Sequence, residues 1–315
     1  MKKFILHIMF FVLCVIIFLI VFDCFISYQL RKSDKVVRNI VWKEIFTGKL
    51  QSNVVIMGSS RAWAQYNPII LDTILHINSY NLGIDGRGIG SQILRYNTYK
   101  RLNVKPKLII QNIDMMTIDK DNAFCREQFF PYFFDKTFRQ EVVELENLSL
   151  ADQYIPGFRY AGYFHKILSW LGVVKQENYT LTKGYHGNDL KWDGSNLNKR
   201  TAINYSQDST MLIKFDEYLA KAYSENIKVI FVYAPQYIGA TEKIKNIGGM
   251  YQMYDSIAQK YDIPILNYNY SPISYDTAYF YNATHLNKKG AELFSVKLAL
   301  DIDSLGILTD KNACQ

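Results

Sequence analysis

The first hydrophobic segment of the chain is much longer than any other. It runs from Phe4 to Phe22, its only polar residue is His7, and two lysines precede it. A helix rises about 1.5 Å per residue, so this segment is long enough to cross a hydrocarbon core of about 30 Å. A cleaved signal peptide is the alternative, but the apolar run is longer than a usual signal core and no small-residue cleavage site follows. The pattern therefore predicts a transmembrane signal anchor over residues 1–26.

Beyond a polar juxtamembrane stretch at 27–50, predicted to be largely helical, short apolar runs alternate with amphipathic segments. The apolar runs are rich in Val or Ile, which is typical of buried parallel strands. We predict strands over Val54–Met57, Lys107–Gln111, Lys228–Tyr233 and Ile263–Leu266. Helical periodicity predicts helices over Pro68–Leu75, Ser91–Leu102, Thr210–Asn226, Met250–Tyr261 and Asn287–Leu300. This alternation predicts an α/β fold with a doubly wound, flavodoxin-like parallel sheet over residues 51–305, followed by a tail at 306–315.

An insertion at about 119–207 interrupts the alternation of predicted strands and helices. The region is rich in aromatic residues, Asn, Gly and Asp, and it has little periodicity. A long insertion in an α/β unit usually packs over the functional edge of the sheet or forms a subdomain. We expect a cap over the active-site end. Its aromatic residues, including Trp170, Tyr185 and Trp192, would form either core or surfaces that stack on sugar rings.

Composition and charge restrict the functional classes only modestly. Hydrophobic residues make up 49% of the chain and aromatic residues 15%, which indicates a folded protein. The net charge of +7 suits an acidic glycan, an anionic lipid or nucleic acid, but the lysines are dispersed, so we expect no nucleic acid partner. GIDGRGIG lacks the spacing of a dinucleotide loop, and His165 and His186 have no neighbouring metal ligands at suitable spacing. We therefore expect neither a cofactor nor a metal ion.

Two adjacent serines follow the first predicted strand, in the sequence VVIMGSSRAW. A strand that ends in Gly-Ser-Ser places Ser60 on a tight turn at the carboxyl end of the sheet, where ligands bind in open α/β folds. If a helix begins there, its free N–H groups also favour a developing anion. The alternative is that Ser59 or Ser60 merely caps this helix. Arg61 would either steer an anionic substrate group or, more commonly, form an exposed surface ion pair.

A histidine near the other end of the chain, in FYNATHLNKKGAELFS, offers a partner for the serine. His285 lies after the last predicted strand and just before the last predicted helix. The loops after the first and last strands of a doubly wound sheet lie on the same edge, so Ser60 and His285 can meet as nucleophile and general base. An isolated histidine is otherwise most often a surface residue or a hydrogen-bonded core residue.

Four short motifs in this order resemble those of the SGNH or GDSL hydrolase superfamily. Gly58-Ser59-Ser60 is similar to the Gly-Asp-Ser block, with Ser60 in the place of the nucleophile and Ser59 replacing the aspartate. In the second block, NLGIDG aligns Gly86 with the glycine of the oxyanion hole.

The third and fourth motifs keep part of the family pattern. QNID offers Asn112 and Asp114 for the Gly-x-Asn-Asp block, with the asparagine one place out of register. NATH keeps the histidine of Asp-x-x-His as His285 and puts Asn282 in the place of the aspartate. The resemblance covers about residues 53–300 without the insertion.

The resemblance implies a serine enzyme with an SGNH-type domain. Ser60 would be the nucleophile and His285 the general base, while the backbone N–H groups of Ser60 and Gly86 and the amide of Asn112 would form the oxyanion hole. Membrane-anchored members act outside the cytoplasm on acyl groups of envelope polymers. For this chain the resemblance implies an esterase or O-acyltransferase for acyl, notably acetyl, esters of envelope or secreted polysaccharide, with a membrane-bound O-acyltransferase as a candidate partner.

Charge bias conflicts with that location. Two lysines precede the apolar segment, whereas more basic residues follow it: Arg31, Lys32, Lys35, Arg38 and Lys43. The positive-inside rule alone would place the C-terminal part in the cytoplasm. The resemblance implies a single-pass inner-membrane protein with an extracytoplasmic domain, and the sequence leaves this conflict open.

Asn282 is the main departure from the family pattern. An aspartate orients the imidazole and stabilises imidazolium, whereas an asparagine carries no charge; the equivalent change in serine proteases costs about 10⁴ in kcat. Three alternatives stay open. Asp276 replaces the missing carboxylate, the enzyme works with a Ser60–His285 dyad, or the chain is a catalytically degenerate binding or scaffold protein of a polymer-modification complex.

Overall fold

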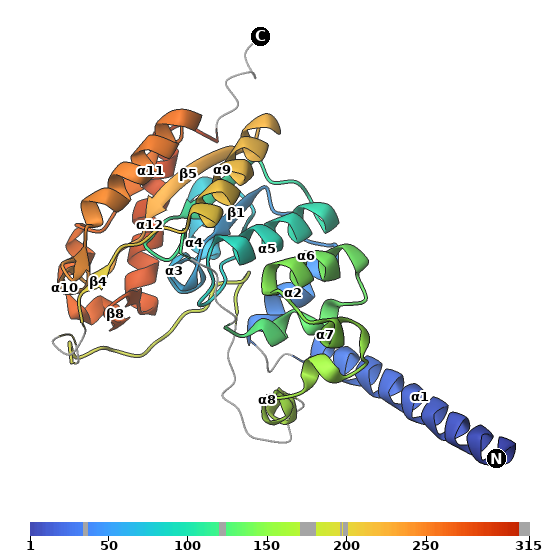
Figure 1. Ribbon diagram of the computed structural model, residues 1–315. Helices are drawn as coiled ribbons and strands as arrows, with labels where there is room; N and C mark the ends of the chain where they lie inside the picture. The colour runs from blue at the N-terminus through green and yellow to red at the C-terminus, as the bar shows by residue number, and fades with distance from the viewer. Residues whose placement is uncertain (34–36, 120–123, 171–180, 196, 198–200, 309–315) are drawn as a thin grey trace, which may run out of the picture. The chain divides into compact units, whose positions relative to one another are not determined.

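The computed structural model describes residues 1–33, 37–119, 124–170, 181–195, 197 and 201–308 (Figure 1). The chain forms two compact units. Unit 1 consists of Met1–Lys43 and Ala123–Tyr179, and unit 2 consists of Glu44–Asn122 and Thr180–Gln315. The predicted insertion at 119–207 is thus divided between the two units.

Five parallel strands form the centre of unit 2, in the order β2-β1-β3-β5-β7. They are β1 (Val54–Met57), β2 (Ser79–Asn81), β3 (Leu108–Asn112), β5 (Lys228–Tyr233) and β7 (Ile265–Asn267). This order confirms the predicted doubly wound, flavodoxin-like sheet. The sequence did not predict β2, because its three residues, Ser-Tyr-Asn, form no apolar run.

Helices cover both faces of this sheet. On one face α9 (Ser209–Ser224) packs against α5 (Ile89–Leu102) and α11 (Ile247–Tyr261), and on the other α12 (Lys288–Ser304) packs against α3 (Ser60–Gln65) and α4 (Pro68–Leu75) (Figure 1). Every helix predicted from the periodicity is present, with ends that shift by a few residues. The remaining helices of unit 2 are α10 (Ile238–Thr241) and the 3₁₀ turns η4 (Pro272–Tyr275) and η5 (Thr277–Tyr279).

Alternate side chains of the strands enter two separate cores. Ile56 belongs to the core that Leu298 of α12 completes, and both side chains are fully buried. On the opposite face, Phe231 stacks on Phe215 with ring centroids 5.7 Å apart and meets Tyr254 edge-on at 6.2 Å. Burying each such side chain contributes about 1.5–3 kcal/mol. The two cores therefore fix the sheet between its helices.

Two small pairs of strands lie outside the central sheet. β4 (Ile203–Asn204) pairs in parallel with β6 (Ile244–Lys245), and β8 (Phe280–Asn282) forms an antiparallel hairpin with β9 (His285–Leu286). The second pair immediately precedes α12, so this hairpin connects the last part of the sheet domain to its last helix.

Unit 1 combines the N-terminal helices with an aromatic segment. Its elements are α1 (Lys2–Lys32), the first part of α2 (Val37–Phe46), α6 (Lys136–Glu146), α7 (Leu150–Tyr154), α8 (Phe164–Trp170) and the 3₁₀ turns η1 (Arg126–Gln128), η2 (Phe130–Tyr132) and η3 (Phe158–Tyr160). The fully buried Trp42 packs against Phe129, Tyr132 and Phe138 with ring centroids 5.1–6.4 Å apart. These aromatic side chains of the predicted insertion therefore build a core.

The two ends of α1 have different environments. It is long and apolar enough to cross a membrane, with a mean hydropathy of 3.3 in its most apolar window, and none of the side chains in that window is buried. Near its end Ile26 and Leu30 are buried, and Asp23 forms an ion pair with Arg159 at 2.6 Å. The exposed apolar section is therefore the candidate span, and the last turns attach it to unit 1.

Gly58 gives a direct test of the turn that follows β1. Its φ is +150°, and a Cβ atom there would lie 2.7 Å from Cβ of Ala62 and 2.8 Å from Cβ of Asn112. We expect Gly58→Ala to lower the free energy of unfolding by about 2–3 kcal/mol, because of backbone strain and overpacking. Thermal unfolding of the full-length chain in a nonionic detergent measures the change.

Gly248→Ala is the matched control for that substitution. Gly248 lies in the first turn of α11, and no atom lies within 4 Å of the position that an added methyl group would occupy. The change should therefore be neutral or stabilising by less than about 1 kcal/mol. Equal melting temperatures for the two variants would contradict the described geometry of the Gly58 turn.

Candidate active site

Two residues that are distant in sequence meet at the carboxyl end of the sheet. Ser60 is the first residue of α3, directly after the turn that follows β1, and His285 is the first residue of β9. The Oγ of Ser60 lies 2.8 Å from Nε2 of His285, across 225 positions of the chain. Both side chains are half-buried. The structure therefore brings together the nucleophile and the base that the sequence predicts.

The β8–β9 hairpin holds the histidine through the side chain of Asn282. Oδ1 of Asn282 accepts hydrogen bonds from the backbone N–H groups of Thr284 and His285, each at 3.0 Å. Because two N–H donors converge on this atom, it is the amide oxygen and not the amide nitrogen. The hairpin thus presents a hydrogen-bond acceptor toward the imidazole.

That acceptor determines which nitrogen of His285 carries the proton. Nδ1 lies 3.0 Å from Oδ1 of Asn282 and 3.1 Å from Oγ1 of Thr284. Since Oδ1 only accepts, the neutral imidazole is protonated at Nδ1, and its Nε2 accepts the hydroxyl hydrogen of Ser60. Tyr281 stacks on the imidazole, with ring centroids 5.3 Å apart and an interplanar angle of 11°. The ring is therefore fixed in the orientation and tautomer of a general base.

Asp276 does not replace the missing aspartate. Its side chain is exposed, and its Oδ1 accepts a hydrogen bond from the backbone N–H of Ala278 at the start of η5. The acceptor behind the imidazole of His285 is therefore an amide. It supplies orientation but no negative charge that would stabilise an imidazolium.

Ser59 and Ser60 have separate environments. Ser59 occupies the N-cap position of α3, but its side chain makes no capping bond; its Oγ donates to Oδ2 of Asp114 at 3.0 Å instead. Ser60 lies inside the helix and contacts His285. The alternative that one of the serines simply caps the helix is therefore wrong.

Asp114 organises the loop after β3. Its Oδ2 also accepts from Nδ2 of Asn112 at 3.0 Å, and its Oδ1 accepts from the backbone N–H of Met116 at 2.8 Å and the hydroxyl of Thr117 at 3.4 Å. These donors and the Ser59 hydroxyl saturate a carboxylate that is only 4% exposed. The QNID motif contains Asp114, but the sequence alone predicts no role for it.

The backbone N–H groups of Ser60 and Gly86 are the first two predicted donors of the oxyanion hole. The N–H of Ile84 donates to the carbonyl of Gly58 at 2.9 Å, so the chain after β2 runs beside the turn before Ser60. Gly86 follows with a φ of +70°, which favours glycine. Within the described residues, the backbone N–H groups of Ser60 and Gly86 donate no hydrogen bond. These two donors remain a prediction for the oxyanion hole.

Asn112 is placed differently from the expectation. It is fully buried, its Nδ2 donates to Asp114, and its Oδ1 accepts from the hydroxyl of Tyr66 at 2.8 Å. Neither Asn112 nor Gly86 is among the residues that line the cavity at Ser60. The amide of Asn112 therefore has a structural function in these contacts, and its role as an oxyanion donor stays a prediction.

A cavity of about 420 Å³ opens beside Ser60 and His285. The strands β4 and β6 contribute Ile203, Asn204 and Ile244 to its lining, so the last part of the predicted insertion does border the site. Arg61 also lines the cavity. It is 7% exposed and, among the described residues, forms no ion pair, so the predicted exposed surface ion pair is wrong. Burial lowers the pKa of Arg61, and the nearby charge of Asp114 opposes that shift.

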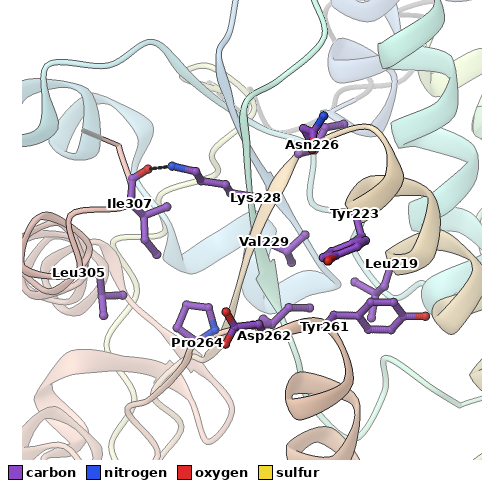
Figure 2. Close-up of a pocket in the computed structure, with 12 residues that line it drawn as sticks. Leu219, Tyr223, Asn226, Lys228, Val229, Tyr261, Asp262, Pro264, Leu305 and Ile307 are labelled. Atoms are coloured by element: carbon purple, nitrogen blue, oxygen red, sulfur yellow. Dashed lines mark hydrogen bonds between the residues drawn. The ribbon is translucent and has the colours of Figure 1, made fainter. Parts of the chain in front are cut away.

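A larger cavity of about 740 Å³ lies elsewhere in unit 2 (Figure 2). Its lining includes Lys228 and Val229 at the start of β5 and Pro264 just before β7. It therefore lies at the amino ends of the strands, whereas Ser60 follows the carboxyl end of β1. In Figure 2, Nζ of Lys228 donates to the carbonyl of Ile307, and the residues that line this cavity include no serine or histidine. We therefore place the candidate active site at Ser60.

Across the residues that the structure describes, no group of three His, Cys, Asp or Glu side chains is arranged to hold a metal ion. The reactive side chains identified at this edge of the sheet are those of Ser60 and His285.

Comparison with known proteins gives a distant likeness of fold. No protein-family model and no curated protein matches the chain. Among solved structures, it is similar to the psychrotrophic esterase EstA from Pseudoalteromonas sp., in a form inhibited by monoethylphosphonate, with 11% identity, 80% of this chain and 97% of that chain covered, and a TM-score of 0.41. It is also similar to a putative lipolytic protein of the G-D-S-L family from Desulfitobacterium hafniense, with 14% identity, 80% and 98% covered, and a TM-score of 0.39.

Substitution of Asn282 tests the arrangement behind the imidazole. Asn282→Asp keeps the acceptor for the three N–H donors and adds a negative charge beside imidazolium. We expect it to raise the rate at which a fluorophosphonate inactivates the full-length chain by at least about tenfold, since the carboxylate of a Ser-His-Asp triad stabilises the imidazolium that forms as the serine attacks.

Asn282→Leu is the complementary variant, because leucine has a similar size and no acceptor. It leaves Nδ1 without its oriented partner, so inactivation should slow by at least about tenfold. If both variants react at the wild-type rate, Asn282 does not position His285.

Proposed function

We propose that this protein is a membrane-anchored serine esterase or O-acyltransferase that acts on acyl esters. One observation supports it above all: the Ser60 hydroxyl donates to Nε2 of His285, while Asn282 holds Nδ1. A nucleophile hydrogen-bonded to a base that a third group orients is the arrangement that acyl transfer requires.

In the proposed reaction, Oγ of Ser60 attacks the ester carbonyl carbon as Nε2 of His285 takes its proton. The carbonyl oxygen becomes an oxyanion, which the backbone N–H groups of Ser60 and Gly86 are proposed to stabilise. Collapse of the tetrahedral intermediate breaks the ester C–O bond, His285 returns the proton to the leaving alcohol, and an acyl-Ser60 remains. A water molecule then completes hydrolysis, or a hydroxyl of an acceptor completes transfer, by the same steps in reverse.

The proposed substrate class is an acyl ester, notably an acetyl ester, of envelope or secreted polysaccharide. Three features support this class: the motif resemblance, the exposed apolar section of α1 and the net charge of +7, which suits an acidic polymer. The domain would then lie on the extracytoplasmic side of the inner membrane, and a membrane-bound O-acyltransferase is a candidate partner.

A binding or scaffold role is the second candidate function. The neutral acceptor at Asn282 and the buried amide of Asn112 favour it, because both reduce the electrostatic stabilisation available to the reaction. The Ser60–His285 contact favours the enzyme, since a scaffold does not need it.

Ester hydrolysis with serine variants tests the proposed reaction. The full-length chain in a nonionic detergent should hydrolyse p-nitrophenyl acetate and should be labelled by a fluorophosphonate. Ser60→Ala and His285→Ala should each lower turnover by at least about 10³, as loss of a triad member does elsewhere.

Ser59→Ala is the matched control, because its hydroxyl contacts Asp114 and not the imidazole. This variant should still be labelled at Ser60. Labelling that persists in Ser60→Ala but disappears in Ser59→Ala would contradict the assignment of the nucleophile. Folded protein with neither turnover nor labelling would favour the scaffold.

The side of the membrane is open to a separate experiment. Alkaline phosphatase fused after Gln315 should be active in a bacterial host, because this reporter folds only outside the cytoplasm where disulfides form. The control is a fusion of a cytoplasmically active reporter at the same position, which should be inactive. The reverse pattern would show that the charge bias, and not the resemblance, determines topology.

A further inference from the structure

Arg61 is a buried cation that has no partner within the described part of the chain. Its side chain is 7% exposed, and its guanidinium makes no hydrogen bond or ion pair there. Burying a charge without a partner is costly. A structural role would normally provide such a partner, so the arginine is a candidate for ligand binding.

The position of Arg61 connects it to the reacting groups. It follows Ser60 on α3 and lines the same cavity as Ser60 and His285. None of its nitrogens is among the unpartnered side-chain atoms that are closed off from solvent. The guanidinium therefore keeps contact with the space in which an ester would bind.

Two neighbouring side chains in the lining also have unsatisfied polar atoms. Tyr233 and Asn269 are each 2% exposed, and the hydroxyl of Tyr233 and Oδ1 of Asn269 are buried without a hydrogen-bond partner among the described residues. Burial raises the pKa of Tyr233, so its hydroxyl stays protonated and can donate. Buried polar groups are otherwise almost always satisfied. The hydroxyl of Tyr233 and Oδ1 of Asn269 are closed off from solvent, so of these three groups the guanidinium of Arg61 is the one that contacts the cavity.

Among the described residues, the two carboxylates that line the cavity form no ion pair with Arg61. They are those of Asp114 and Asp119. The oxygens of Asp114 accept from the donors of its own loop and from Ser59. Its charge still favours the protonated form of Arg61. The fork of N–H donors on Arg61 thus remains available to an oxyanion.

We propose that Arg61 binds an oxyanionic substituent of the substrate, a carboxylate or a phosphate, within the cavity beside Ser60. A planar guanidinium matches the oxygens of either group. The identification of this ligand as part of an ester substrate rests on the proposed function.

Binding of charged and neutral probe pairs tests this inference without turnover. Isothermal titration calorimetry on the full-length chain in a nonionic detergent compares D-glucuronate with D-glucuronamide, and glycerol 3-phosphate with glycerol. In at least one pair the anion should bind at least about tenfold more tightly, as expected for a charged hydrogen bond. The pair that shows this preference identifies the anion as carboxylate or phosphate.

Variants of Arg61 show whether the preference depends on this side chain. Arg61→Gln should abolish it, and Arg61→Lys, which keeps the charge without the fork, should retain part of it. Arg101→Gln is the control, because it removes one charge from an exposed position on α5 of the same unit. It should retain the wild-type preference, and thermal unfolding verifies that each variant is folded.

Three results would overturn the inference. They are equal or absent binding of both members in both pairs, a preference that survives Arg61→Gln, and a preference that Arg101→Gln also abolishes. Arg61-dependent binding in a chain that hydrolyses no ester would contradict the proposed function while leaving the anion site in place. If Arg61→Gln does not fold, full wild-type preference in Arg61→Lys would count against recognition by the guanidinium fork.

Discussion

The candidate active site depends on one oxygen atom, Oδ1 of Asn282. The N–H groups of Thr284 and His285 fix this oxygen, and the oxygen in turn fixes the proton of the imidazole at Nδ1. Only that tautomer leaves Nε2 free to accept the hydroxyl hydrogen of Ser60. Here the amide oxygen takes the orienting place of a carboxylate, but it carries no charge that would stabilise imidazolium. The geometry of a general base is therefore complete, while the electrostatic part of its activation is reduced.

The candidate site also requires that two segments distant in sequence lie side by side, and the fold brings them together. In a doubly wound sheet the turns after β1 and before α12 reach the same edge, so residues 225 positions apart come within hydrogen-bond distance. The sequence predicted this much, because short Val-rich and Ile-rich runs and helical periodicity are local signals. It also selected Ser60 and His285, since each follows a strand at that edge. The strand β2 was missed because Ser-Tyr-Asn owes its conformation to its neighbours and not to its own hydrophobicity.

The remaining features of the site depend on tertiary contacts that leave no local pattern. An arginine after Gly-Ser-Ser is indistinguishable in sequence from a solvated helix residue, and only the packing of α3 shows that Arg61 is buried beside the cavity. The hydrogen bond from Ser59 to Asp114 joins two loops. A helix-capping motif instead predicts that the serine side chain bonds to a backbone N–H of its own helix. Likewise, Asp276 is close to His285 in sequence but caps η5. The aromatic insertion also gave no sign that its first part packs with the N-terminal helix in unit 1.

The protonation state of His285 is the most direct test of this account. Long-range ¹H–¹⁵N correlation spectra of the full-length chain, labelled with ¹⁵N-histidine, distinguish the two imidazole nitrogens, and His285→Gln assigns the signal among the 5 histidines. With the imidazole neutral, we predict a protonated Nδ1 and an unprotonated Nε2 that shifts on Ser60→Ala. A proton on Nε2 in the neutral imidazole would contradict the account, because His285 could not then accept the proton of Ser60.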